Sequence, residues 1–204
     1  MSKGLFITFE GVDGCGKTTQ IKLLDEYLRN KGYKTLITRE PGAKGLGEKI
    51  REILLNYDGE VSSGCESFLF LADRAQHADC IVKPAINAGT IVLCDRHTDS
   101  TIAYQGYGRG VNITELKHLN EIAVNGLKPD LTIVFDIDSE TSAARVGKEK
   151  DRMESAGIEF FEKVRHGYLD IAKQEPDRVK VIDSARPVEE IHNKVLELLT
   201  DVIG

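Results

Sequence analysis

The chain has 204 residues, of which 41% are hydrophobic and 29% charged, and its formal net charge is −6. This length suits one well-buried domain, so we expect residues 1–204 to fold as a single domain. The negative charge excludes a global basic field, so we expect no nucleic-acid partner. No apolar run reaches membrane-spanning length and the first residues show no signal-peptide pattern, so we expect a cytoplasmic protein with no membrane partner.

Five continuous apolar runs predict strands that are covered on both faces of a sheet. Stretches with apolar residues at helical spacing lie between these runs. This alternation predicts an α/β fold with a five-stranded parallel sheet flanked by helices. We expect strands at residues 5–9, 35–38, 90–94, 131–137 and 179–182, and helices at 19–28, 46–55, 66–87, 115–127, 160–173 and 188–202.

A glycine-rich loop of the form Gly-x-x-x-x-Gly-Lys-Thr follows the first expected strand and precedes the first expected helix. This setting predicts a phosphate-binding loop and a P-loop NTPase fold, because the glycines let backbone N–H groups face phosphate oxygens at a helix N-terminus. Lys17 is expected to reach the β- and γ-phosphates, and the Thr18 hydroxyl to ligate Mg²⁺. The alternative is a glycine-rich turn that binds nothing. The nucleotide would be held by Gly11, Val12, Asp13, Gly14, Cys15, Gly16, Lys17, Thr18 and Thr19.

Two arginines lie at the ends of expected strands. Arg39 ends the second strand just before the tight turn that Pro41 and Gly42 predict, and Asp95-Arg96 ends the third. Ligands of open α/β sheets bind at the carboxyl ends of strands, so we expect both arginines to bind phosphate and Asp95 to face Mg²⁺. The alternatives are a surface arginine at Arg39 and a helix-capping role for Asp95.

Phe70 and Arg74 are four residues apart in an expected helix and therefore share a face. On the residues alone Phe70 fits a core position, although an aromatic–arginine pair can also stack on a base and bond its edge. Residues 105–110 are predicted to form a glycine-rich turn. The charged segment around residues 145–154, between two helices, is predicted to be a mobile lid.

The four cysteines include no Cys-x-x-Cys pair, which fits a reducing compartment. Cys65, His77 and Cys80 could be drawn as a metal cluster, but their ligand spacing is incomplete, and we expect buried or helical thiols instead.

The chain resembles the thymidylate kinase family over nearly its whole length. The resemblance rests on the phosphate loop at residues 11–19, on Arg-Glu-Pro-Gly at 39–42 and on residues 69–74. It continues through the most selective block, residues 95–106, and through residues 151–154, 160–165 and Tyr168. Other nucleotide kinases share the phosphate loop but not residues 95–106.

The resemblance implies a role for each matching position. Phe70 would stack on thymine and Arg74 would bond the base edge, while Tyr104 would pack under the deoxyribose and disfavour a 2′-hydroxyl. Residues 184–187 would lie against adenine. The resemblance implies that dTMP is bound by Asp13, Arg39, Pro41, Phe70, Arg74, Arg96, Ser100, Thr101, Tyr104 and Gln105. The implied catalytic residues are Lys17, Arg96, Arg152 and Asp13. Arg145 and Arg186 would contact ATP, and Thr18 and Asp95 would hold the metal.

Three positions depart from the commonest family pattern. Gly14 stands where one branch of the family carries an arginine, so the missing charge must come from the lid, where Arg145, Lys148, Lys150 and Arg152 are available. His97 stands where tyrosine is often found. Ala43-Lys44 replaces a usual second glycine, and Lys44 could alter the charge of the acceptor pocket.

The resemblance implies Mg²⁺-dependent transfer of the ATP γ-phosphoryl group to dTMP, giving dTDP and ADP for dTTP synthesis, by a homodimer. The acceptor phosphate has a second pKa of about 6 and needs no general base. A P-loop kinase with another acceptor and a nucleotide-dependent binding protein stay open. A regulatory GTPase also stays open, although residues 193–196 lack the final acid of a guanine-reading Asn-Lys-x-Asp element.

Overall fold

The computed structural model describes residues 4–145, 152–153 and 156–203, so the predicted lid lies mostly outside the described residues. Five parallel strands form one sheet in the order β2-β3-β1-β4-β5. This confirms the expected sheet, and each strand agrees with its prediction to within one residue at either end. The strands are β1 (Phe6–Glu10), β2 (Thr35–Arg39), β3 (Ile91–Asp95), β4 (Leu131–Asp136) and β5 (Val179–Asp183).

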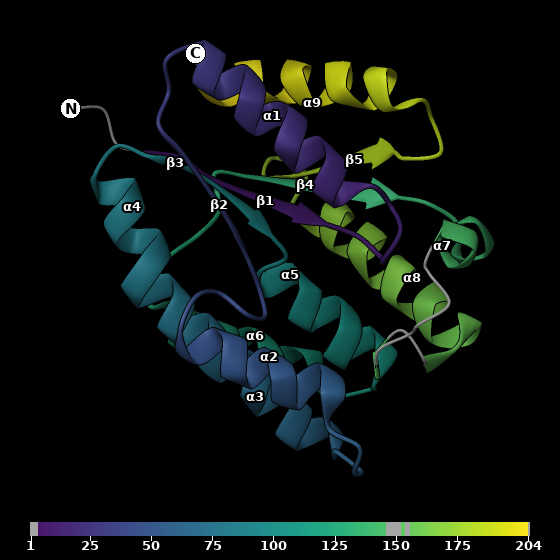
Figure 1. Cartoon of the computed structure of the whole chain (residues 1–204). Coiled ribbons are helices and arrows are strands. Elements are labelled where there is room, and N and C mark those ends of the chain that lie inside the picture. The colour runs from purple at the N-terminus through teal and green to yellow at the C-terminus, as the bar shows by residue number, and fades with distance from the viewer. Residues whose placement is uncertain (1–3, 146–151, 154–155, 204) are drawn as a thin grey trace.

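Helices cover both faces of the sheet (Figure 1). α1 (Lys17–Asn30) and α9 (Val188–Ile203) pack together on one face, and Ile21, Leu24 and Leu28 of α1 are buried there as their spacing predicts. The other described helices lie on the opposite face or at the edges. These are α2 (Leu46–Asn56), α3 (Ser63–His77), α4 (Lys83–Asn87), α5 (Thr98–Thr101), α6 (Ile113–Val124), α7 (Ser139–Arg145), α8 (Ile158–Gln174) and the π-helical segments η1 (Ala78–Val82) and η2 (Ile102–Gly108).

The long helix expected at residues 66–87 is divided into α3, η1 and α4, which follow one another without a loop. Pro84 lies in the first turn of α4 and has no N–H to donate to the preceding turn. The chain widens to π-helical geometry in η1 just before this proline, which accommodates the missing hydrogen bond.

The prediction of a glycine-rich turn at residues 105–110 was wrong for the first four of these six residues. Residues up to Gly108 belong to η2, which continues α5 and packs against α8. A Cβ at Gly108 would lie 2.5 Å from the Phe160 ring of α8, so this glycine permits close helix packing and not a turn. The chain leaves the helix only at Arg109, whose N–H bonds the Tyr104 carbonyl.

All five strands end at the same edge of the sheet because they are parallel. In the register of the sheet, Asp95 at the end of β3 lies beside Phe9 of β1 and Arg39 of β2. The loop after β1 and the ends of β2 and β3 therefore meet at one edge, where α/β sheets bind their ligands.

Candidate active site

The glycine-rich loop connects β1 to α1 at this edge. Gly11 has a φ of +134°, and a Cβ there would lie 2.6 Å from the Phe135 carbonyl oxygen, so only glycine fits. Lys17 is buried and its Nζ donates to the Gly11 and Val12 carbonyls at 3.1 Å each. Thr18 and Thr19 are exposed in the first turn of α1. The loop therefore presents backbone amides, a lysine and a hydroxyl at a helix N-terminus, as an anion site requires.

Asp95 fits the predicted metal role. It lines the cavity beside the loop, and its Oδ1 is buried without a hydrogen-bond partner among the described residues. A buried carboxylate oxygen without a donor is costly unless a cation or water satisfies it. With the exposed Thr18 hydroxyl, Asp95 offers the hard oxygen ligands that Mg²⁺ prefers.

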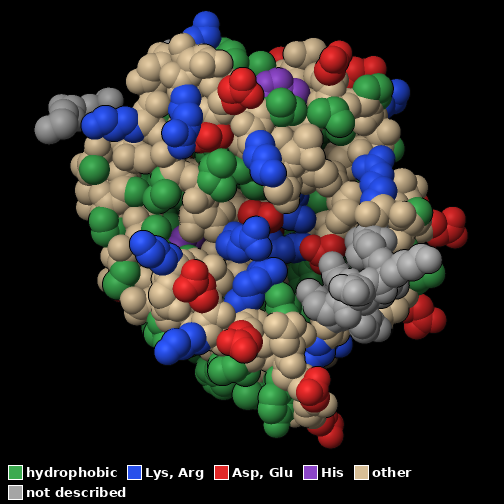
Figure 2. Space-filling model, in the orientation of Figure 1, with side chains coloured by type: hydrophobic (Ala, Val, Ile, Leu, Met, Phe, Trp, Pro, Cys, Tyr) green, Lys and Arg blue, Asp and Glu red, His purple; other side chains and the backbone are tan. Residues whose placement is uncertain are grey.

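A cavity of about 120 Å³ opens next to the loop, and every residue of the predicted dTMP-binding set lines it. Figure 2 shows Lys and Arg side chains gathered around a hollow in the middle of this face of the molecule. Beyond the predicted set, the cavity is lined by Glu40, Arg51, Leu55, Asp95 and Met153.

Arg96 and Asp13 line the cavity next to the phosphate loop. The Arg96 guanidinium donates to Asp13 Oδ1 at 2.7 Å and to the Gly11 carbonyl at 2.8 Å, and it lies over the Tyr104 ring. Burial would raise the pKa of Asp13, but the charges of Arg96 and Lys17 outweigh burial and lower this pKa to about 2. The cavity wall beside the phosphate loop therefore carries an ionised carboxylate, Asp13, and a cation, Arg96, that is bonded to the loop.

Arg74 and Phe70 come from α3 and also line the cavity. The Arg74 guanidinium is 1% exposed and donates to Glu40 Oε2, Thr101 Oγ1, Asn120 Oδ1 and the His97 carbonyl. These bonds occupy four of the five N–H donors of an arginine. Arg74 is thus rigidly held, and its fifth donor has no hydrogen-bond partner among the described residues.

Glu40 is the centre of this rigid arrangement, and the sequence analysis assigned it no role. Its Oε1 accepts from His77 Nδ1 at 2.7 Å and from His97 Nδ1 at 2.9 Å, while its Oε2 accepts from Arg74. Burial opposes ionisation of Glu40, but its histidine and arginine partners hold its pKa well below the usual value. Burial lowers the pKa of His97, which keeps its imidazole neutral. One carboxylate thereby balances the charge of Arg74 inside the protein.

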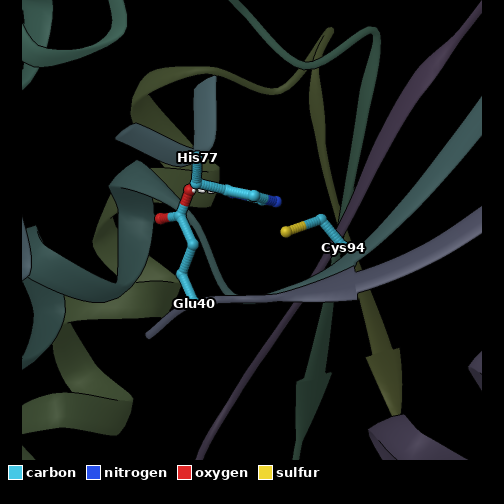
Figure 3. Close-up of side chains that lie close together, drawn as sticks. All are labelled: Glu40, His77 and Cys94. Atoms are coloured by element: carbon cyan, nitrogen blue, oxygen red, sulfur yellow. Dashed lines mark hydrogen bonds and ion pairs between the residues drawn. The ribbon is translucent and has the colours of Figure 1, made fainter. Parts of the chain in front are cut away.

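His77 also lies near Cys94, and Figure 3 shows its ring directed toward that sulfur with Glu40 alongside. Their potential ligand atoms lie within 4.8 Å of one another. His77 Nε2 is however bonded to Thr38 Oγ1 at 2.8 Å, and burial raises the pKa of the Cys94 thiol well above its usual value. Because both His77 nitrogens are occupied and the thiol stays protonated, we interpret this cluster as a hydrogen-bonded core. Cys65 and Cys80, which the sequence analysis considered together with His77, are exposed.

Arg152 lies beside Met153, a residue of the cavity wall, and its Nη2 donates to the Met153 sulfur at 3.7 Å. Its Nη1 is 2.6 Å from Oε2 of the buried Glu66, and its Nε donates to the Leu54 carbonyl. Glu66 Oε1 also accepts from Gln105 and Arg109. In this structure Arg152 is therefore tied to α2 and α3, and none of its hydrogen-bond partners among the described residues lies in the phosphate loop. Lys148 and Lys150, the other predicted lid cations between Arg145 and Arg152, lie outside the described residues.

The predicted adenine-contacting segment follows β5. Arg145 at the end of α7 donates to the Ser184 carbonyl at 3.2 Å, and Ser184 is anchored to the Asp136 carbonyl. Arg186 is exposed and pairs with Asp183 at 3.0 Å. The structure thus brings Arg145 to residues 184–187, while Arg186 remains at the surface.

Taken together, a phosphate loop between the first strand and helix and a basic acceptor cavity beside it define a P-loop nucleotide kinase. The model of the thymidylate kinase family matches residues 9–195, and the chain belongs to this family. It is accordingly an enzyme that transfers a phosphoryl group.

Known proteins agree with this assignment over the whole chain. The thymidylate kinase of Pelotomaculum thermopropionicum is 49% identical and the alignment covers 98% of this chain and 95% of the relative. The thymidylate kinase of Thermoanaerobacter sp. is 46% identical, with 97% and 98% covered. A crystal structure of thymidylate kinase from Ehrlichia chaffeensis superimposes with a TM-score of 0.80 at 38% identity, covering 97% of this chain and 99% of that chain.

Proposed function

We propose that this kinase transfers the γ-phosphoryl group of ATP to dTMP in the presence of Mg²⁺ and releases dTDP and ADP. One observation carries the proposal. A single cavity beside the phosphate loop is lined both by an aromatic ring and a held guanidinium, Phe70 and Arg74, and by Arg39, Arg96 and Asp13. Such a cavity suits a molecule with a flat polar base at one end and a dianionic phosphate at the other.

The donor half of the site would hold ATP. Backbone amides of residues 11–16 and the α1 N-terminus would surround the β- and γ-phosphates, and Lys17 would turn from its carbonyl partners to contact them. Thr18 and Asp95 would hold Mg²⁺, which supplies charge neutralisation on the transferring group. Arg145 and residues 184–187 would lie beside the adenosine moiety.

The acceptor phosphate would lie between Arg39 and Arg96, close to Pro41. A dianionic phosphate oxygen is already a competent nucleophile, so the site needs no general base. Catalysis would then consist of positioning the two phosphates in line and offsetting their charge. Arg152 would contribute to this only after exchanging Glu66 for the transferring phosphate.

The base and the sugar would occupy the remainder of the cavity. Phe70 would stack on thymine, and the remaining donor of Arg74 would bond the base edge near Thr101 and Gln105. Tyr104 would pack under the deoxyribose, where its buried ring contacts Phe160, Phe161 and Tyr168. A ring held on so many sides leaves a 2′-hydroxyl little room.

We further propose that residues 1–204 act as one domain in a cytoplasmic homodimer that needs no nucleic acid or membrane. Every strand joins one sheet, and the net charge is −6. None of the helices among the described residues combines the length and apolar content that crossing a bilayer requires. Large apolar side chains are exposed on α2, α3 and α6, where a second copy would cover them.

Calorimetric binding of dTMP to the Phe70→Ala variant tests the base assignment. We expect the dissociation constant to rise by roughly 10- to 100-fold, because a buried stacking contact is worth about 1–3 kcal/mol. Tyr33→Ala removes an exposed aromatic side chain between α1 and β2 and should leave binding unchanged. Unchanged dTMP affinity in Phe70→Ala would show that the base does not lie on this ring.

A further inference from the structure

Glu10 is the last residue of β1, and its side chain is fully buried although none of the roles above involves it. Its Oε1 accepts the His97 backbone N–H at 2.7 Å. Its Oε2 accepts the Ser100 hydroxyl at 2.6 Å and the Tyr168 hydroxyl at 3.0 Å. A buried carboxylate persists only when its oxygens are well bonded. These bonds tie the end of β1 to the segment that follows Arg96.

Arg96 has an unusual backbone conformation, with a φ of +72°. A side chain with a Cβ is disfavoured in this left-handed region, so neighbouring groups must hold it there. The Arg96 N–H donates to the Phe9 carbonyl at 3.0 Å, and its carbonyl accepts the Cys94 thiol at 3.1 Å. The bond from His97 N–H to Glu10 fixes the next peptide, so Glu10 completes the set of contacts around this turn.

Glu10 is also linked to the Arg96 side chain. Arg96 Nη1 donates to the Tyr168 hydroxyl at 3.2 Å and to Ser100 Oγ at 3.4 Å. These two hydroxyls are 2.8 Å apart, and both bond Glu10. One carboxyl group therefore supports the backbone and, through two hydroxyls, the guanidinium of the same arginine.

The charged groups facing Glu10 come from two other elements. Burial, followed by the nearby charge of Asp99 in α5, raises the pKa of Glu10 to about 7, while Arg96 after β3 acts in the opposite direction. At neutral pH the carboxyl is thus partly protonated. It still accepts the His97 N–H, because a carboxyl group keeps an acceptor oxygen in either state.

We propose that Glu10 is a positioning residue, which holds the left-handed turn at Arg96 so that the guanidinium meets the acceptor phosphate. The inference rests on the proposed function, since the phosphate is taken to be that of dTMP. Among the described residues, Glu10 forms no hydrogen bond with Phe70 or Arg74. It should therefore affect the binding of the phosphate and leave the recognition of the nucleoside intact.

Calorimetric affinities for dTMP and for thymidine, which lacks the phosphate, test this. In Glu10→Ala we expect dTMP to bind about tenfold more weakly, while thymidine binding stays within twofold of the unchanged protein. Thr8→Val is the matched control, because Thr8 is equally buried on the same strand and its hydroxyl bonds Thr132, away from Arg96. It should leave the ratio of the two affinities unchanged.

Two further variants test whether Glu10 acts through its bond to the His97 N–H and through Arg96. Glu10→Gln keeps a carbonyl oxygen for the His97 N–H, so we expect dTMP affinity to recover to within about threefold. When Arg96→Ala is already present, Glu10→Ala should weaken dTMP binding by less than a further twofold. If Glu10→Ala does not fold, Tyr168→Phe should show the same phosphate-specific loss, about threefold or more.

Three outcomes would each overturn the inference. Glu10→Ala could weaken the binding of dTMP and of thymidine equally, or Glu10→Gln could bind dTMP as weakly as Glu10→Ala. The effects of Glu10→Ala and Arg96→Ala on dTMP affinity could also be additive. If the unchanged protein bound no dTMP, the proposed function would fail, and the inference with it. Normal dTMP binding that is indifferent to Glu10 would refute the inference alone.

Discussion

At the scale of single residues, the cavity is built from opposite charges that are paired before any substrate arrives. Arg74 pairs with Glu40, Arg96 with Asp13 and Arg152 with Glu66, each at 2.6–2.8 Å. Arg74–Glu40 is fully buried and the other two pairs are partly buried. Buried pairs add little stability, because desolvation offsets most of their attraction, but breaking one leaves a costly charge. They hold the guanidinium groups of Arg74 and Arg96 in the cavity wall, and they hold Arg152 beside it. Pre-positioned cations are what phosphoryl transfer requires of a protein.

Asp73 is a buried carboxylate without such a partner. Its Oδ1 accepts the Gly42 N–H at 3.2 Å, and its Oδ2 has no hydrogen-bond partner among the described residues. Burial, followed by the charge of Glu40, raises the pKa of Asp73 to about 6. Because this pKa lies above its unfolded value, the stabilising effect of its proton is complete below about pH 4 and is lost as the pH rises through 6.

Asp73→Asn should therefore stabilise the protein at pH 8, where the buried charge is removed. We expect the free energy of unfolding to rise by roughly 1–3 kcal/mol at pH 8, with the gain disappearing near pH 4. Urea unfolding at both pH values measures this. Asp79→Asn, an exposed acid paired with Lys83, should change stability by less than about 0.5 kcal/mol. A loss of stability at pH 8 would contradict the account of Asp73.

At the scale of elements, the strands could be predicted because each is a continuous apolar run buried on both faces. The phosphate loop and the strand-end residues Arg39, Asp95 and Arg96 followed, because parallel strands end at a common edge. The π-helical segment η2 could not be predicted, since Gly106 serves a contact with α6 and Gly108 a contact with α8, and the local sequence reveals neither. The buried roles of Glu10 and Glu40 were hidden for the same reason. Tyr168 binds Glu10 from 158 residues away, and His97 binds Glu40 from 57 residues away.

Gly108 tests the packing of η2 against α8. A Cβ at this position would lie 2.5 Å from the Phe160 ring, so Gly108→Ala should lower the free energy of unfolding by about 1–3 kcal/mol. Gly64→Ala is the matched control, because a Cβ in this first turn of α3 meets nothing within 4 Å. It should leave the protein unchanged or stabilise it by up to about 1 kcal/mol. Equal melting temperatures for the two variants would show that the close approach is unimportant.

At the scale of the whole molecule, α2, α3 and α6 carry exposed side chains typical of an interface. α3 packs between α2 and α6. Ile53, Phe68 and Ile122 on these helices, and Tyr57 directly after α2, are 48–62% exposed. Light scattering after size exclusion should therefore return twice the chain mass of 22.6 kDa. Phe68→Glu should shift the mass to that of one chain, whereas Tyr33→Glu should not. A single-chain mass for the unchanged protein would rule out the homodimer.

The most direct test of the central claim is ADP release, coupled to an indicator reaction, with ATP and Mg²⁺ and a panel of acceptors. The panel contains dTMP, dUMP, dCMP, dAMP, dGMP and UMP. We expect the highest kcat/KM with dTMP and a loss of roughly 10²–10³ in kcat for Lys17→Ala, with Lys22→Ala on the exposed side of α1 unaffected. A higher kcat/KM with another acceptor would contradict the assignment of the base-binding residues, and full turnover by Lys17→Ala would contradict the role of the phosphate loop.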